Sequence, residues 1–401
     1  MDRKEFLKTS LTLGIGLPFL SVLLESCDSS VIEPLDIAPN FQGKVLIIGA
    51  GSAGMTAAYL LKQQNIDFEI LEAASDFGGR MKRISDFADF PIDLGAEWIH
   101  TDPKILGEML NDTSHQGKVE TIVYNPKSVY NWNRDKLRKK NWSSAFYSEH
   151  KFKSTTWYGF FDTFVVPEIR DRMRLNTPVT AIDYSGEKIQ VTTSQNELIE
   201  ADKVIVTIPV KMLQLDSIAF TPALPQAKKE AIESIDMEYG IKVFIEFEEK
   251  FFPDMTLIGP FLQALGDNGR LYYDAAFRKD SEKNIMGLFA VGEGAEAFAT
   301  MDSDQEVIDT ILAQLDEVFD GKASEHYVKH ITQNWSQEPY IQGSYALYFE
   351  GNRSEIQENL LSTLDEKIYF AGEAMSNYNQ STVHGAAETA YWAVQKIFEG
   401  Q

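Results

Sequence analysis

A glycine-rich turn near residue 50 has the residue types and the spacing that bind a dinucleotide. Gly49, Gly51 and Gly54 follow an apolar run in G-x-G-x-x-G spacing. The first glycine permits a tight turn, the second lets the backbone approach a pyrophosphate, and the third lets a helix pack closely on a strand. Glu72 follows at the distance, about 20 residues, at which an acid binds ribose hydroxyls. The motif therefore predicts FAD or NAD rather than a cofactor with a phosphorylated ribose.

A second chemical candidate is the lysine in the strand-like stretch Glu238–Phe247, EYGIKVFIEF. In a strand, alternate residues share a face, so Lys242, Phe244 and Glu246 form one row. Considered alone, this pattern favours a half-solvated sheet with Lys242 in water, because lysine is almost never buried without a reason. The alternative is that Lys242 is buried at a functional site. The rest of the chain favours this second interpretation, with Phe244 facing inward and Glu246 where the face reaches water.

The segments around these residues alternate between strand-like and helix-like patterns. The apolar run Val45–Ile48 is typical of a buried strand, Ala53–Gln64 has a helical composition, and Asp67–Leu71 is a second strand. This order predicts an α/β fold in which an FAD-binding Rossmann-like domain is joined to a substrate domain of mixed sheet plus helices. In that second domain we expect strands at 271–277 and 285–291 and a helix at 304–319.

Short motifs along the chain resemble those of one enzyme family. Gly78-Gly79-Arg80 is similar to the motif with which flavoproteins of the glutathione-reductase structural class place an arginine near the FAD pyrophosphate. The other motifs resemble, in the same order, those of the flavin-containing amine oxidases, which include monoamine and polyamine oxidases and flavin-dependent histone demethylases. The similar segments are Asp93–His100, Leu175–Ile182, Ala201–Pro209, Asn334–Trp335, Gly343–Tyr345, Ile368–Glu373 and Ser381–Ala386.

This resemblance implies a non-covalently bound FAD, since Ser344 replaces the cysteine with which monoamine oxidases tether the flavin. An apolar stripe from Val383 is by itself more typical of a helix core. Beside Gly372 and Glu373, we interpret its small residues at 385–387 as the helix end that approaches the flavin ring. The residues assigned to FAD binding are Gly49, Gly51, Ser52, Ala53, Gly54, Glu72, Gly79, Arg80, Gly95, Ala96, Glu97, Trp98, Val179, Trp335, Gly372, Glu373, Thr382 and Val383.

Lys242, Tyr345 and Thr382 are the catalytic candidates that the resemblance implies. In the family, a lysine at the first position holds a water near flavin N5. Tyr345 would form one wall of an aromatic cage around the amine, and Thr382 stands at the opposite wall. The implied reaction is hydride transfer from the carbon next to a neutral amine to flavin N5. Hydrolysis of the imine then gives an aldehyde plus ammonia or an amine, and O₂ reoxidises the flavin to give hydrogen peroxide.

Two other functions are compatible with the same scaffold. One is an FAD-dependent desaturase or isomerase that acts on an apolar ligand, which Lys242 and Tyr345 disfavour. The other is a non-catalytic FAD-binding lipoprotein. Its only support is the length of segment 101–174. Relatives usually have a longer segment here, which forms a helical roof over the substrate cavity.

Residues 101–174 carry a basic run and many aromatic residues. The run of five basic residues between 134 and 140 is most simply a solvated face. Aromatic clusters of this kind more often form a small hydrophobic core than a ligand-binding site. The shortened roof predicts an open substrate pocket. The aromatic residues concerned are Trp132, Trp142, Phe146, Trp157, Tyr158, Phe160 and Phe161.

Charge and composition exclude some partners. The net charge of −23 argues against nucleic acid, whose phosphates require a basic surface, and would attract a cationic small molecule. The six histidines show no ligand spacing such as H-E-x-x-H, so we assign no metal.

The first 27 residues have the features of an export signal. A basic start and an apolar run at 11–24 resemble a signal peptide, and Arg3-Lys4 resembles a twin-arginine signal. Leu24-Glu25-Ser26-Cys27 resembles a bacterial lipobox, which predicts export to the periplasm and a lipid anchor on Cys27. An uncleaved N-terminal helix or ordinary secretion is the alternative. The expected parts are a signal peptide at 1–27, a tether at 28–43, an FAD domain at 44–100, 175–214 and 366–401, and a substrate domain at 101–174 and 215–365.

Overall fold

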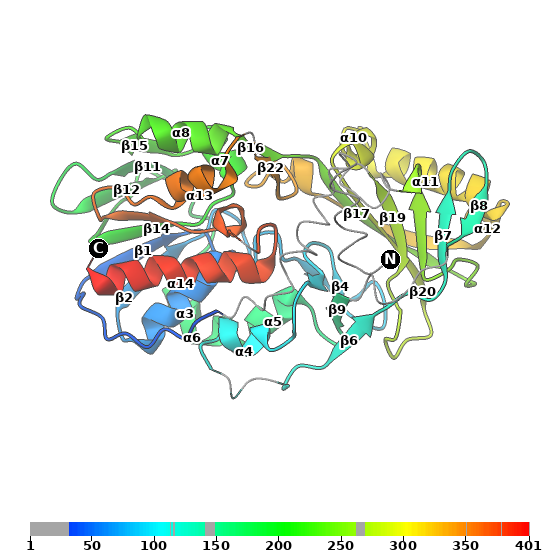
Figure 1. Ribbon diagram of the computed structural model, residues 1–401, viewed down its shortest axis with the longest axis horizontal. Coiled ribbons are helices and arrows are strands. Elements are labelled where there is room, and N and C mark those ends of the chain that lie inside the picture. The colour runs from blue at the N-terminus through cyan, green and yellow to red at the C-terminus, as the bar shows by residue number, and fades with distance from the viewer. Residues whose placement is uncertain are drawn as a thin grey trace.

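A computed structural model describes residues 32–112, 114, 117–140, 149–261, 269–349, 351–377 and 379–400. The predicted signal peptide, Cys27, Trp142 and Phe146 lie outside the described residues. The chain forms two lobes that lie side by side, a nucleotide lobe and a substrate lobe (Figure 1). Among the described residues, no helix has the length and apolar character needed to span a membrane.

The nucleotide lobe is built on a parallel sheet of five strands from distant parts of the chain. Because both faces of the sheet are covered, the strands are continuous apolar runs rather than alternating ones. Val45 and Ile47 face one core, while Leu46 and Ile48 face the other. In sheet order the strands are β10 (Met173–Arg174), β2 (Asp67–Leu71), β1 (Lys44–Ile48), β14 (Lys203–Val206) and β23 (Ile368–Phe370).

Two helices from opposite ends of the chain cover the first face. Helix α3 (Ser52–Gln63) lies beside α14 (Val383–Glu399), as Figure 1 shows in blue and red. Their shared core contains Leu60, Ala390 and Val394. The C-terminal apolar stripe therefore belongs to the helix core along most of its length. Within α14, only Val383 and Ala386 of the first turn line the cavity between the lobes.

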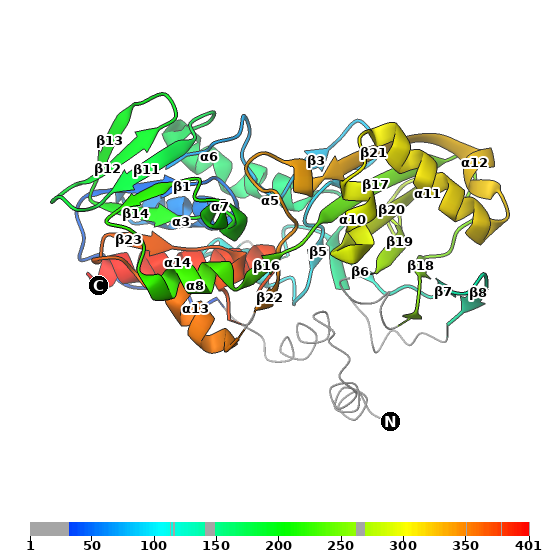
Figure 2. The same cartoon turned by 90° about the horizontal axis from the view of Figure 1, so that it is seen from above.

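The second face carries a smaller sheet and short helices. The sheet order is β13 (Leu198–Ala201), β12 (Ile189–Thr193), β11 (Val179–Asp183) and β15 (Ala219–Thr221). The helices packed in the same layer are α7 (Val210–Gln214), α8 (Gln226–Glu233) and α13 (Arg353–Leu361). A ladder of β16 (Ile235–Met237) and β22 (Ala346–Phe349) stands where the chain crosses between the lobes (Figure 2).

The substrate lobe is a seven-stranded mixed sheet with helices on one face (Figure 1). Its strand β17 (Gly240–Phe247), the second from one edge of the sheet, is buried over its whole length. Ile241 and Val243 face the helices, whereas Phe244 packs in a separate core on the other face. The remaining strands are β21 (Tyr327–Asn334), β20 (Asn284–Val291), β19 (Arg270–Asp274), β18 (Met255–Ile258), β7 (Val129–Trp132) and β8 (Leu137–Lys139). The helices are α10 (Glu293–Ala299), α11 (Asp304–Phe319) and α12 (Lys322–His326).

Residues 101–174 divide between the two lobes, unlike the sequence-based assignment of the whole stretch to the substrate domain. The hairpin β7–β8 extends the substrate sheet, and its basic residues Arg138 and Lys139 are exposed, as a solvated face requires. Trp157 and Phe160 enter the core of the nucleotide lobe instead of forming a small core of their own. The helices of this stretch are α4 (Ile105–Met109), α5 (Trp157–Phe164) and α6 (Val166–Ile169).

Small ladders fill the space between the lobes. A three-stranded sheet has the order β5 (Trp98–Ile99), β9 (Glu149–Phe152) and β6 (Thr121–Tyr124), and β3 (Arg83–Ile84) pairs with β4 (Ile92–Asp93). Strand β9 thus brings residues from the short roof next to the segment that resembles a flavin-contacting motif.

Candidate active site

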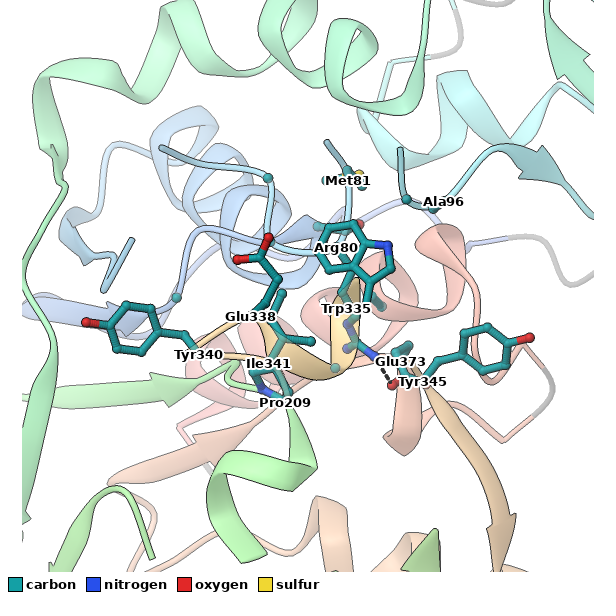
Figure 3. A pocket seen from close by; sticks show the side chains of 18 of the residues that line it. Arg80, Met81, Ala96, Pro209, Trp335, Glu338, Tyr340, Ile341, Tyr345 and Glu373 are labelled. Atoms are coloured by element: carbon teal, nitrogen blue, oxygen red, sulfur yellow. Dashed lines mark hydrogen bonds and ion pairs between the residues drawn. The ribbon is translucent and has the colours of Figure 1, made fainter. Parts of the chain in front are cut away.

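A cavity of about 1090 Å³ lies between the lobes and is lined by both of them. It brings together all the residues assigned above to FAD binding or catalysis except one. The exception is Gly54, which lies beneath the glycine turn. Figure 3 shows part of the wall, with Tyr340 and Tyr345 on opposite sides of Trp335 in this view.

The glycine turn leaves open the space that a pyrophosphate would need. Gly49 has a φ of +106°, which favours glycine, and Gly51 precedes helix α3. A Cβ atom on Gly51 would meet no atom within 4 Å, whereas one on Gly54 would lie 1.9 Å from the carbonyl oxygen of Gly49. Gly51 therefore permits a ligand to approach, and Gly54 permits the helix to pack against the strand.

Glu72 lines the cavity at the end of β2, where the ribose was expected. Its Oε2 accepts a hydrogen bond from the backbone N–H of Ala50 at 2.6 Å, and its Oε1 accepts one from Ala74 at 2.8 Å. Burial raises the pKa of Glu72, although these backbone donors oppose the rise. Val179 lies in the same part of the wall and is buried.

The two ends of the chain meet at the centre of the cavity. The Ser52 hydroxyl donates a hydrogen bond to the carbonyl of Val383 at 2.8 Å, which joins α3 to the start of α14. Arg80 forms an ion pair with Glu373, Nη1 to Oε1, at 2.8 Å and donates to the carbonyl of Ser344 at 2.9 Å (Figure 3). The arginine predicted at the pyrophosphate is thus held by the C-terminal motif.

Thr382 lines the cavity, but its hydroxyl has a structural task. It accepts a hydrogen bond from the N–H of Gly385 at 2.9 Å, so it caps helix α14, and it donates to the carbonyl of Asn379 at 2.6 Å. Its Oγ1 is therefore committed to the helix start, and only the rest of the side chain can shape the cavity wall.

Lys242 lies inside the molecule, with 3% of its surface exposed. Its Nζ donates to the carbonyls of Asp93 at 2.8 Å and Gly95 at 3.0 Å, and to Glu97 Oε2 at 2.7 Å. An ammonium group has three N–H donors, so protein atoms accept all of them. Lys242 thereby anchors the segment 93–97, and its charge borders the cavity.

The carboxylate of Glu97, a residue assigned to FAD binding, is shared by several buried groups. Oε2 accepts from Lys242 and from the hydroxyl of Tyr273, and Oε1 forms an ion pair with Lys151. Burial opposes ionisation, but Lys151 and Lys242 together hold the pKa of Glu97 below its usual range. Burial also raises the pKa of nearby Asp93 to about 8.

Some wall residues were not found from the sequence. Phe289 pairs across the sheet with Lys242, and Glu338 accepts hydrogen bonds from Lys82 at 3.0 Å and Gln333 at 2.6 Å. The alternation of β20 could have indicated Phe289. Lys151 stands in a stretch with no motif, and only the fold brings it to Glu97.

The expectation that Glu246 reaches water was wrong. This residue is 6% exposed, because Lys283 at 2.6 Å and Lys329 at 3.4 Å cover its carboxylate. Among the described residues, no group of three or more histidine, cysteine, aspartate or glutamate side chains is placed to hold a metal ion.

The residues present fit an FAD molecule. An open glycine turn, a buried acid at the position expected for the ribose and an arginine held by Glu373 line a single cavity. The cavity then continues to Lys242 and Tyr345 in the substrate lobe, so a bound flavin ring would meet a substrate there.

Comparison with known proteins adds independent evidence on the family of this chain. A profile described as flavin containing amine oxidoreductase matches residues 162–398, and one described as an NAD(P)-binding Rossmann-like domain matches residues 47–113. Polyamine oxidase 4 of Oryza sativa subsp. japonica is 24% identical, over 85% of this chain and 86% of its own length. Lysine-specific histone demethylase 2 of Homo sapiens is 24% identical over 88% of this chain, which spans 53% of the demethylase.

A solved structure shares the fold. Wild-type putrescine oxidase bound to putrescine superposes with a TM-score of 0.73 at 15% identity, with 88% of this chain and 98% of that chain covered.

Proposed function

The chain belongs to the flavin-containing amine oxidoreductase family, and from this premise we propose that it is an oxidase that converts an amine to an imine. FAD is the cofactor, and the reaction class is oxidation of a CH–NH group. The observation that carries the proposal is that one cavity joins FAD-binding residues from both chain ends to Lys242 and Tyr345.

Bound FAD would accept a hydride from the carbon next to the amine nitrogen and pass two electrons to O₂, which takes up two protons to form hydrogen peroxide. The chain's own residues position the reactants. Tyr345 presents an aromatic wall that orients the amine, and the Thr382 side chain shapes the wall opposite. Lys242 supplies a fixed positive charge at the cavity, where dioxygen would gain negative charge. Water then hydrolyses the imine to an aldehyde plus ammonia or an amine.

The substrate we propose is an amine that is cationic in solution and neutral when it reacts. The net charge of −23 favours the approach of a cation. The names of the related polyamine and putrescine oxidases make di- and polyamines the first compounds to test.

We further propose that the protein is exported to the periplasm and lipid-anchored through Cys27. The support is the signal-like sequence of residues 1–27, which lies outside the described residues. Metabolic labelling with a fatty acid should mark the wild-type protein and leave Cys27→Ser unlabelled. Equal labelling of the two would exclude this anchor.

The test of the activity is an amine screen on the purified protein without residues 1–27. We expect a flavin spectrum that bleaches when a reactive amine is added without oxygen, and peroxide release when air is admitted. Denaturation in acid should release all FAD, because Ser344 offers no thioether link. Bleaching by an apolar ligand but by no amine would point to the desaturase or isomerase alternative. A bound flavin that nothing bleaches would point to a binding protein.

A further inference from the structure

A second lysine, Lys151, is buried close to Lys242 on strand β9. Only 1% of its surface is exposed, although no sequence motif marks it. Its ammonium lies over three rings, 4.7 Å from the centre of Trp98, 5.0 Å from that of Tyr273 and 5.3 Å from that of Tyr124. The faces of aromatic rings attract cations, so this cage fixes the position of the charge.

The charge of Lys151 is directed at Glu97. One carboxylate oxygen of Glu97 pairs with Lys151, while the other accepts from Lys242 and Tyr273. Two buried ammonium groups thus share one carboxylate. If Lys151 were absent, Glu97 would cancel the charge of Lys242 in a one-to-one pair.

Other charged groups of the region contact different atoms. The Asp93 side chain accepts a hydrogen bond from the N–H of Trp157 at 3.1 Å. Lys279 donates to the carbonyl of Phe152 at 3.1 Å and lies over the ring of Phe90. Lys151 is therefore the group in a position to offset Glu97.

We propose that Lys151 is a positioning residue that acts through Glu97. Its caged ammonium occupies one carboxylate oxygen, so that Lys242 stays in place and presents an uncancelled positive charge to the cavity. This inference rests on the proposed function, because it concerns the reactivity of a bound flavin. Its test needs no amine, because light reduces the flavin.

The first variant is Lys151→Met, with Lys153→Met as the matched control. Lys153 directly follows β9, two residues after Lys151, and pairs at the surface with Glu120 and Asp280. We expect Lys151→Met to keep FAD, to lower the flavin midpoint potential, and to slow reoxidation of the photoreduced protein by O₂ about tenfold. A tenfold change corresponds to about 1.4 kcal/mol, a modest effect for the loss of one buried charge. Lys153→Met should match the wild type in both measurements.

The decisive variant is the double substitution Lys151→Met with Glu97→Gln. It removes both charges of the pair and leaves that of Lys242, so in protein that retains FAD the midpoint potential and the reoxidation rate should lie above those of Lys151→Met. The comparison is made with the single variant, because Glu97 itself lines the cofactor site. A residue that only stabilises the fold would give no such recovery. If Lys151→Met alone does not fold, Tyr273→Phe removes just the hydroxyl donor to Glu97 and should lower the potential in the same direction by less.

Wild-type potential and reoxidation rate in Lys151→Met, or a double variant as impaired as the single one, would overturn the inference. An amine screen without bleaching would count against the proposed function only, since photoreduction does not depend on the substrate.

Discussion

At the scale of single residues, the charge at the cavity depends on Lys242, which protein atoms hold through three acceptors, and on Glu97, which two buried lysines share. Glycine spacing and one acid at the end of β2 pointed to the dinucleotide site because each position follows from local backbone geometry. The three acceptors of Lys242 and the pairing of Glu97 with Lys151 depend on contacts between residues far apart in the chain. No local pattern encodes such contacts, so they had to come from the structure.

Lys242→Met tests the role of the buried charge. We expect FAD to remain bound, because the lysine contacts segment 93–97 and not the glycine turn. Flavin reduction or reoxidation should slow by about 100-fold or more, the usual range for loss of one preorganised electrostatic group. Stopped-flow absorbance measures both steps, and the exposed Lys229→Met serves as control. Rates like those of the wild type would show that Lys242 has only a structural role.

At the scale of elements, the sequence located most helices and strands of both lobes. Strand β2 and helix α11 have the predicted bounds. Strand β1 begins one residue before the predicted start, and helix α3 begins and ends one residue earlier than predicted. The compact basic stretch was not foreseen as part of a sheet. Strand β7 pairs in parallel with β18, more than a hundred residues later in the sequence, and parallel partners are not indicated by a nearby turn.

Two glycines of the β1–α3 turn should respond differently to alanine. In Gly51→Ala the new methyl group meets open space, so the protein should fold but lose FAD. In Gly54→Ala it would strike the carbonyl of Gly49, so we expect a loss of stability of about 1–3 kcal/mol or more as well as FAD loss. Thermal unfolding and flavin absorbance separate the two outcomes, with the exposed Gly186→Ala as control. Full FAD binding by Gly51→Ala would contradict the assignment of the pyrophosphate.

The contact between helices α8 and α13 should make stability depend on pH. The Nζ of Lys228 donates to the carbonyls of Asn359 at 2.9 Å and Leu360 at 2.6 Å and lies 4.0 Å from the centre of the Phe370 ring. Burial lowers the pKa of Lys228 to about 7, whereas an unfolded chain has a lysine pKa near 10.4.

Between these two values the unfolded chain binds the proton that the folded protein releases. The free energy of unfolding should therefore rise from pH 7 to about pH 10, by at most about 1.4 kcal/mol per pH unit, and this contribution is lost as the pH falls back through 7. Chemical denaturation over this range should show the slope in the wild type and in the exposed-site control Lys229→Met. The rise of the unfolding free energy with pH should be absent in Lys228→Met. An unchanged rise in this variant would show that other groups cause it.

At the scale of the whole molecule, the negative charge should act on the substrate before it reaches the cavity. We expect kcat/KM for a cationic amine to fall with added salt, because screening shortens the reach of the field to about 10 Å at 0.1 M ionic strength. The rate of reoxidation by uncharged O₂ is the internal control and should change little. A kcat/KM that is independent of salt would show that the overall charge does not guide the substrate.

The arrangement of the nucleotide lobe also determines when, during synthesis of the chain, the FAD site can be assembled. Strand β1 is synthesised early, but its sheet partner β14 comes more than a hundred residues later, and α14 ends at Glu399 of 401 residues. At about 5–20 residues per second, the ribosome needs roughly 20 to 70 s to pass from the start of β1 to the end of α14. The substrate-lobe sheet, whose last strand ends at Asn334, can close while the ribosome is still working. The hydrogen bond from Ser52 to Val383 cannot form until the final helix has emerged. The FAD site is therefore assembled only after α14 has been synthesised, and we expect a message truncated before this helix to yield a protein without flavin.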